Sequence, residues 1–272
     1  MKKYTSVFNI ITRSSIYKIL VLLIIMSVVE VGLYTHQMNT MLERYAQMSD
    51  RMDDKQNYES EFMQESGETQ NEQSLLVTME DMFQISHTTK VFAITFVLIS
   101  ILLCLTGCNF GSRQDYIWKR LQVSEKTVFF IQVLYNCLIL ILFVSVQIIV
   151  AYGLCNYYVS IVPEGVTNQS IFLAFYRSVF LHSILPLEAS LKWLANILVM
   201  LALGFATAMF PYKQRRRKMS VHMILMLGVT LMFFLSELGE FETNAMLMLW
   251  SVCMAGICLW QILRDKEGLH EG

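Results

Sequence analysis

The chain has 272 residues, of which 55% are hydrophobic and 16% are charged, and its formal net charge is −1. Soluble domains carry about 25% charged residues, so this composition excludes an ordinary soluble domain. The near-neutral net charge says little, because the charges are segregated along the chain, and nothing in the sequence indicates a nucleic-acid partner. We therefore expect an all-α integral membrane protein, since in lipid a helix satisfies its own backbone groups.

Six apolar stretches approach or exceed the eighteen or so residues that cross about 30 Å of hydrocarbon. The third stretch is too long for a straight crossing, so we expect it to tilt or to extend beyond the bilayer. The first is expected to be a retained span and not a signal peptide, because no small-residue cleavage site follows its long apolar run. The expected spans are residues 17–35, 91–108, 128–158, 193–211, 221–237 and 245–263.

Lysine and arginine in the short connections predict the orientation. The N-terminal segment and the 109–127 connection hold four basic residues each, and the "KQRRRK" connection holds five. The "SELGEFETN" connection holds none and carries three glutamates. Six crossings bring every basic cluster to one side. We therefore expect both termini in the cytoplasm, and the protein in a bacterial cytoplasmic membrane.

Two longer segments are expected on the outer side. Residues 36–90 are acidic and rich in Met and Gln, and the apolar spacing after residue 36 predicts that the first span continues outward as a helix. Their central part is either a helical hairpin or a loose loop. Residues 159–192 are apolar but are interrupted by Arg177, His182 and Pro186. We expect an outer interfacial or re-entrant segment there, because a seventh span would place basic clusters on both sides.

Motifs for catalysis, cofactors and metals are not found in the sequence. There is no phosphate-binding Walker A motif, no nucleophile elbow and no zinc-protease motif. All six cysteines fall in or beside apolar segments, where they are expected to be small apolar side chains and not disulfide partners or metal ligands. We therefore expect no enzyme activity, no cofactor and no metal site in this chain.

Four polar residues within the expected spans are candidates for a translocation pathway. Glu30 lies twelve residues after Lys18, which places its carboxyl group roughly 18 Å along the first span. A charge at that depth is costly and is usually paired or faces a cavity. The third span carries the others, Gln132, Asn136 and Gln147, close to one helix face. Such residues line a pathway or join packed helices by hydrogen bonds, and the sequence leaves both interpretations open.

The cytoplasmic connection "GSRQDYIWKRLQVSEK", residues 111–126, is longer and more polar than two linked spans require. Read as a helix, it is amphipathic, and its apolar face comprises Phe110, Ile117, Trp118 and Leu121. Such a helix lies in the lipid interface or docks into a groove on a soluble partner. A similar N-terminal interfacial helix is expected before the first span, with Tyr4, Val7, Phe8 and Ile11 on one face.

This layout resembles the permease subunits of type-2 ATP-binding-cassette exporters. The residues that carry the resemblance are "KRLQVSEKTVFFIQVLYN", similar to the family's short helix-turn before the third span, and the outer piece "FYRSVFLHSILPL". The resemblance covers most of the chain in layout. The outer segment 36–90 is longer than the tight hairpin of the simplest members, and it leaves the substrate class open.

The resemblance implies a permease that pairs with a second copy or a paralogue and is powered by separate ATP-binding subunits. It also implies that the helix between spans two and three is a coupling helix, which fits a cleft on the ATPase. Its contact residues would be Arg113, Asp115, Trp118, Lys119, Arg120 and Leu121. The alternative is a sensor, immunity or scaffold protein that does not transport and that binds a ligand through residues 36–90.

Overall fold

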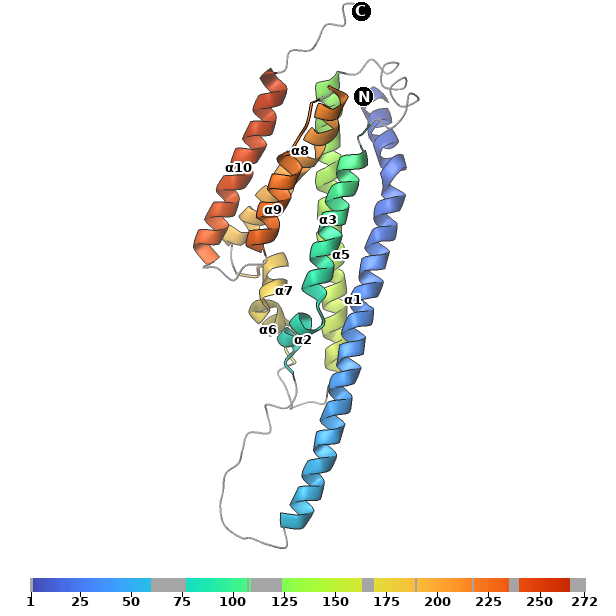
Figure 1. Cartoon of the computed structure of the whole chain (residues 1–272), viewed down its shortest axis with the longest axis vertical. Helices are drawn as coiled ribbons and strands as arrows, with labels where there is room; N and C mark the ends of the chain where they lie inside the picture. The colour runs from blue at the N-terminus through green and yellow to red at the C-terminus, as the bar shows by residue number, and fades with distance from the viewer. Residues whose placement is uncertain are drawn as a thin grey trace, which may run out of the picture.

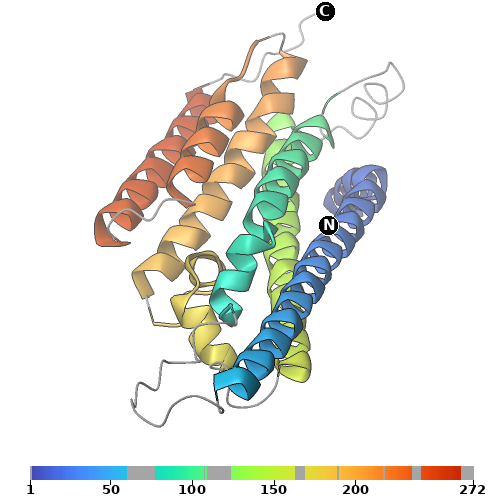
Figure 2. The same ribbon diagram turned by 60° about the horizontal axis from the view of Figure 1, so that its bottom comes forward.

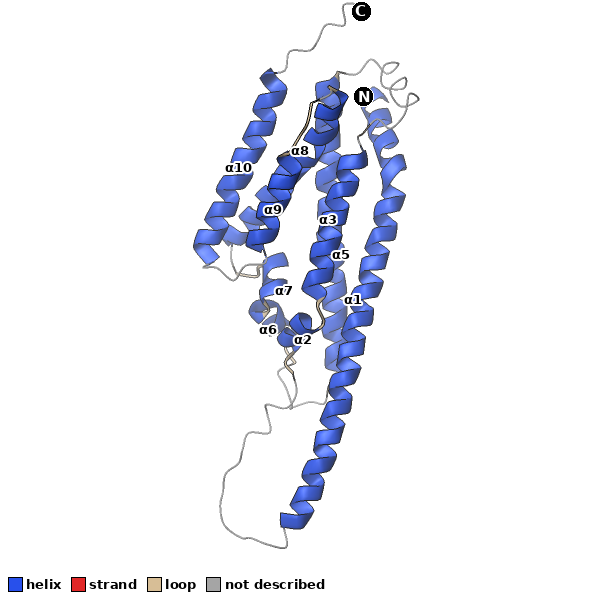
Figure 3. Cartoon of the chain, viewed as in Figure 1, coloured by secondary structure: helices blue, strands red, loops and turns tan. Residues whose placement is uncertain are grey.

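The computed structural model describes residues 2–59, 77–106, 108, 124–162, 169–188, 190–216, 218–234 and 240–264. Throughout these ranges every regular element is a helix, so the predicted all-α class is confirmed (Figure 3). The helices are α1 (Lys2–Glu59), α2 (Met79–Ile85), α3 (Thr88–Thr106), α5 (Glu125–Ile161), α6 (Ile171–Arg177), α7 (Val179–Ile184), α8 (Ser190–Arg215), α9 (His222–Phe234) and α10 (Glu240–Arg264).

Five of the described helices are long and apolar enough to cross a membrane, so the chain is a multi-pass membrane protein. The apolar spans are Ser15–Gln47, Thr88–Thr106, Glu125–Ile161, Ser190–Arg215 and Phe241–Arg264. The remaining expected span falls on α9, whose thirteen residues rise only about 20 Å. Helix α9 runs antiparallel to its neighbours, so α1 begins and α10 ends at the same end of the bundle (Figure 1).

The N-terminal segment differs from its expectation, because its residues form the first turns of α1 and not a separate interfacial helix. The apolar side chains of Val7 and Ile11 are buried within the protein. Phe8 packs edge-on against the ring of Tyr135 on α5 at 6.0 Å, and the Tyr135 hydroxyl shares a 2.6 Å hydrogen bond with Ser15. No proline or glycine precedes residue 32, so nothing breaks the helix between this segment and the span.

At the opposite end of the bundle, α1 continues to Glu59, so the first helix extends beyond its expected span, as predicted. Met38 on this extension is buried, as are Met79, Met82 and Phe83 of α2. The rings of Tyr34 and Phe83 lie 5.4 Å apart. Helix α2 is thus held against α1, and the short helices α6 and α7 lie at the same end as α2 (Figure 1). Residues 60–76 lie outside the described part.

Helix α8 is the centre of the bundle, because it packs against α3, α5, α9 and α10 (Figure 2). Its buried face is rich in small residues, namely Ala195, Ala202, Gly204, Ala206 and Ala208. Small side chains let neighbouring helix backbones approach closely in a membrane. At Gly204 the approach to α5 is close: an added Cβ would collide with Cys137 Sγ and lie 3.4 Å from the Val133 carbonyl oxygen.

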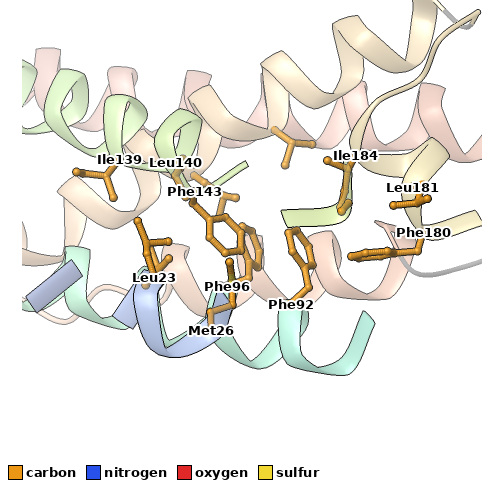
Figure 4. Packing of buried hydrophobic residues seen from close by; sticks show 14 of the residues in the cluster. Leu23, Met26, Phe92, Phe96, Ile139, Leu140, Phe143, Phe180, Leu181 and Ile184 are labelled. Atoms are coloured by element: carbon orange, nitrogen blue, oxygen red, sulfur yellow. The ribbon is translucent and has the colours of Figure 1, made fainter. Parts of the chain in front are cut away.

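Aromatic side chains fill the space between α3, α5 and α7 (Figure 4). The ring of Phe92 on α3 stacks on Phe143 of α5, with centroids 4.9 Å apart. It also meets Phe180 of α7 edge-on at 5.5 Å. Such pairs stabilise a core by about 0.5–1.5 kcal/mol beyond their buried area. They attach the short helix α7 to the end of the membrane-spanning bundle.

Replacing Gly204 with Ala is expected to destabilise the protein by about 1–3 kcal/mol, because the added methyl group overpacks the α5–α8 contact. A Cβ added at Gly256 of α10 would meet no atom within 4 Å, so Gly256→Ala is the matched control and should change stability by about 1 kcal/mol or less. Thermal unfolding in detergent measures both. Adding Cys137→Ala should restore much of the loss at Gly204, and equal behaviour of the two glycine variants would contradict the close contact.

Candidate functional site

Glu30 is fully buried between α1 and α5 and not exposed to lipid. It shares one face of α1 with Leu23, Met26 and Tyr34, which recur at spacings of three and four and are also buried. This face packs against α5, where Gln147 Nε2 donates a 3.0 Å hydrogen bond to Glu30 Oε2. The pair joins two predicted pathway residues that lie 117 positions apart in the chain.

The other oxygens of this pair, Glu30 Oε1 and Gln147 Oε1, are buried without a hydrogen-bond partner in the described structure. A carboxylate supplies only acceptors, whereas a neutral carboxylic acid supplies one O–H donor. A neutral Glu30 therefore provides the hydrogen that Gln147 Oε1 lacks, and acid and amide can bond reciprocally. A buried carboxylate with no cation beside it would instead carry a large desolvation cost in the membrane.

The second buried polar contact joins α5 to α8. Asn136 Nδ2 donates a 2.8 Å hydrogen bond to Thr207 Oγ1, and Thr207 in turn donates to the Leu203 carbonyl oxygen at 2.7 Å. Thr207 is one turn from Gly204, so the close backbone approach brings the two side chains within reach. One turn before Asn136, Gln132 is also buried, and its Nε2 has no partner among the described residues.

All four predicted pathway residues are thus buried in helix–helix contacts of a single chain. Two of them bond to each other, one bonds to α8, and Gln132 lies beside that contact on α5. Of the two interpretations left open by the sequence, this arrangement favours the joining of packed helices. None of the four lines the cavity described next.

A partly open cavity lies among α3, α5, α7, α8 and α9, and the empty space in it and at its open mouth together is about 600 Å³. Its walls are almost entirely apolar, and the rings of Phe92, Phe96 and Phe143 form one side (Figure 4). The two polar side chains in the lining already have partners. Asn196 Nδ2 donates to the Ser183 carbonyl oxygen at 3.0 Å, and Thr230 Oγ1 donates to the Met226 carbonyl oxygen at 2.7 Å. Sequence reasoning missed this cavity, because its walls come from five separate helices.

At the end of the bundle where α5 begins, a charged contact joins α5 to the connection after α8. Arg216 donates from Nη2 and Nε to Glu125 Oε2 at 3.0 and 3.1 Å, and its guanidinium lies 4.7 Å from the centre of the Tyr212 ring. Ser124 caps α5 by accepting a hydrogen bond from the Thr127 amide. Glu125 in the first turn also complements the positive end of the helix dipole.

The predicted ATPase-contact residues lie immediately before this contact in the chain. They are outside the described residues, so no geometry is assigned to Arg113, Asp115, Trp118, Lys119, Arg120 or Leu121. The described ends of the connection are Cys108 and Ser124. Glu125, which falls in the expected 111–126 segment, is in fact the first residue of α5, and it bonds to Arg216, so the start of α5 is tied to the α8–α9 connection.

Within the described ranges, no group of three or more His, Cys, Asp or Glu side chains is placed to hold a metal ion. The six cysteines form no disulfide with one another. Known proteins give no further guide, because no family model, curated protein or solved structure matches the chain. Its function must therefore be inferred from its residues and their geometry.

Replacing Gln147 with Leu is expected to destabilise the protein by about 1–3 kcal/mol, since Glu30 then loses its one hydrogen-bond partner among the described residues in a buried site. Glu30→Gln should cost much less, because two amides can bond reciprocally as the neutral acid and amide do. Thermal unfolding in detergent, with exposed Gln84→Leu as a control, measures the difference. If Glu30→Gln is as harmful as Gln147→Leu, the neutral acid–amide pairing is wrong.

Proposed function

We propose that the chain is the permease subunit of an ATP-binding-cassette exporter in a bacterial cytoplasmic membrane. In this proposal α9 completes six crossings, both termini are cytoplasmic, and residues 111–126 dock on a separate ATP-binding subunit. The observation that carries the proposal is the bond between Glu125 and Arg216. It ties the start of α5, which directly follows the predicted docking segment, to the connection after α8.

A displacement of segment 111–126 would reach the membrane through this contact. Glu125 starts α5, and Arg216 directly follows α8, so the ion pair holds the ends of both helices together. The pair is partly exposed, and such pairs contribute about 1 kcal/mol or less to stability. Its role is therefore to position the helix ends. Further along, the close approach at Gly204 and the hydrogen bond between α5 and α8 keep the two helices moving as one unit.

The short helix α9 supports a sixth crossing by its direction and surroundings. It packs against α8 and α10, and the three helices alternate in direction. A stretch shorter than the hydrocarbon thickness is accommodated by local thinning of the bilayer. With α9 as the fifth of six crossings, the last turn of α10, with Arg264, lies on the same side as the N-terminus and the basic residues after α8, as the positive-inside rule requires.

Energy for transport must come from a second protein in this proposal, because the sequence has no phosphate-binding motif. ATP binding and hydrolysis in that partner would shift the permease between two states with different access to the pathway. A second permease, either a copy or a paralogue, would complete the pathway, and membrane lipid would surround both. Glu30, Gln132, Asn136 and Gln147 would then join helices within each subunit.

One observation favours a second candidate function, a sensor, immunity or scaffold protein that does not transport. Helix α1 is 58 residues long, roughly 90 Å, and continues twelve residues beyond the apolar span that ends at Gln47. A rigid outward projection suits the binding of an external ligand. In that case the 111–126 segment would lie in lipid and would bind no ATPase.

The exporter proposal predicts that an ATPase subunit copurifies with the chain in mild detergent and is lost from the double variant Trp118→Ala with Leu121→Asp. These substitutions remove the largest apolar contact of the docking face and add a charge to it. The matched control is Trp193→Ala with Leu187→Asp, which changes the same residue types at exposed positions near the opposite end of the bundle. The control should retain the ATPase. If no ATPase binds, or if both variants keep it, the docking role is wrong and the second candidate is favoured.

A further inference from the structure

The lining of the cavity among α3, α5, α7, α8 and α9 follows one face of α8. On α8 its lining residues are Asn196, Val199, Met200 and Leu203, at spacings of three, four and seven. They form a stripe that runs along one helix face for about 10 Å. Helices α3 and α5 contribute shorter sets, with spacings of three and four. The lining therefore extends farthest along α8, and we call this cavity the slot.

The chemistry of the slot excludes a polar occupant. Among the described residues no charged side chain lines it, and its two polar side chains, Asn196 and Thr230, already donate to backbone carbonyl groups. Apolar cavities of this kind do not retain water and take up hydrocarbon ligands. Side chains that line an empty space also lack the dispersion contacts that they would make with neighbouring atoms. An apolar ligand gains those contacts, whereas water gains no hydrogen bonds.

The surroundings of the slot identify the source of such a ligand. Several lining residues are next in sequence to side chains that face outward from the bundle: Ala93 precedes Ile94, which is 61% exposed, and Leu231 precedes Met232, which is 69% exposed. Ile94 lies on α3, one of the helices long and apolar enough to cross a membrane, and Met232 lies on the shorter apolar helix α9. The slot is partly open, and Ala93 in its wall is only half-buried. Bilayer hydrocarbon is thus the apolar material nearest to it.

Helix α7 forms the end of the slot. Ile184 of α7 lies in the lining, and Phe180 of the same helix contacts Phe92 in the wall (Figure 4). The carbonyl oxygen of Ser183, also on α7, accepts the hydrogen bond from Asn196 of α8. A chain in the slot would therefore touch α7, α8 and the aromatic wall at once, and would fill the space between a short outer helix and the centre of the bundle.

We propose that this slot binds one acyl chain of a bilayer phospholipid. The bound chain lies parallel to α8 between the Phe92–Phe143 wall and the apolar residues of α8 and α9. This binding site is independent of the exporter proposal, since it requires neither an ATPase nor a second permease.

Photocrosslinking tests the site with the full-length protein in phosphatidylcholine vesicles. A fraction of the phosphatidylcholine carries a diazirine in the middle of one acyl chain, and mass spectrometry locates the crosslinks after irradiation. We expect crosslinks on the lining residues of α3 and α8. Ala93→Phe should fill the slot and reduce those crosslinks several-fold, whereas Ile94→Phe, at the adjacent lipid-facing position, should leave them unchanged.

The experiment also includes a second slot-filling variant and a second labelled ligand. Val199→Phe fills the slot from the opposite wall and replaces Ala93→Phe should that variant fail to fold, as judged by thermal unfolding. A diazirine fatty acid in the same vesicles tests the source of the chain. Crosslinks from the fatty acid alone, no crosslinks on the lining residues, or equal crosslinking of Ala93→Phe and Ile94→Phe would each overturn the proposal.

Discussion

The close approach of α5 and α8 at Gly204 is the contact on which the rest of the bundle depends. Because the glycine has no side chain, the Asn136 amide on α5 reaches the Thr207 hydroxyl on α8. Helix α8 then presents its remaining faces to α3, α9 and α10, while α5 presents its other face to α1. In a membrane no hydrophobic effect draws apolar helices together, so small residues and buried hydrogen bonds must specify the packing.

Three polar contacts join α5 to distant parts of the chain at different levels. The Glu125–Arg216 ion pair joins its first turn to the connection after α8, Asn136 bonds to α8 further along, and Gln147 bonds to Glu30 of α1 beyond that. Beside Asn136, Tyr135 also bonds to Ser15 of α1. Helix α5 is thereby held to α8 or the connection after it at two levels and to α1 at two levels. This arrangement would carry a displacement at the charged end into the membrane without separating the helices.

The helices were predictable from the sequence because a membrane span is a local property: length and apolarity over about twenty residues decide it. Five expected spans correspond to helices of spanning length. Glu30 and Gln147 were also predictable as unusual residues for a span, but their pairing across 117 positions depends on tertiary packing. The apolar face around Phe8 was expected to meet lipid. It meets Tyr135 instead, because an amphipathic pattern does not specify which apolar surface covers it.

The account requires that the charged end of the bundle face the cytoplasm and that α9 cross the membrane. Cysteine substitutions at Met219 and Phe241, which are 96% and 72% exposed and flank α9, test both points in intact cells with a membrane-impermeant maleimide. The wild-type chain gives the background from the native cysteines. The account predicts labelling of Phe241→Cys in intact cells and of Met219→Cys only after permeabilisation. Labelling of both from outside, or of Met219→Cys alone, would contradict it.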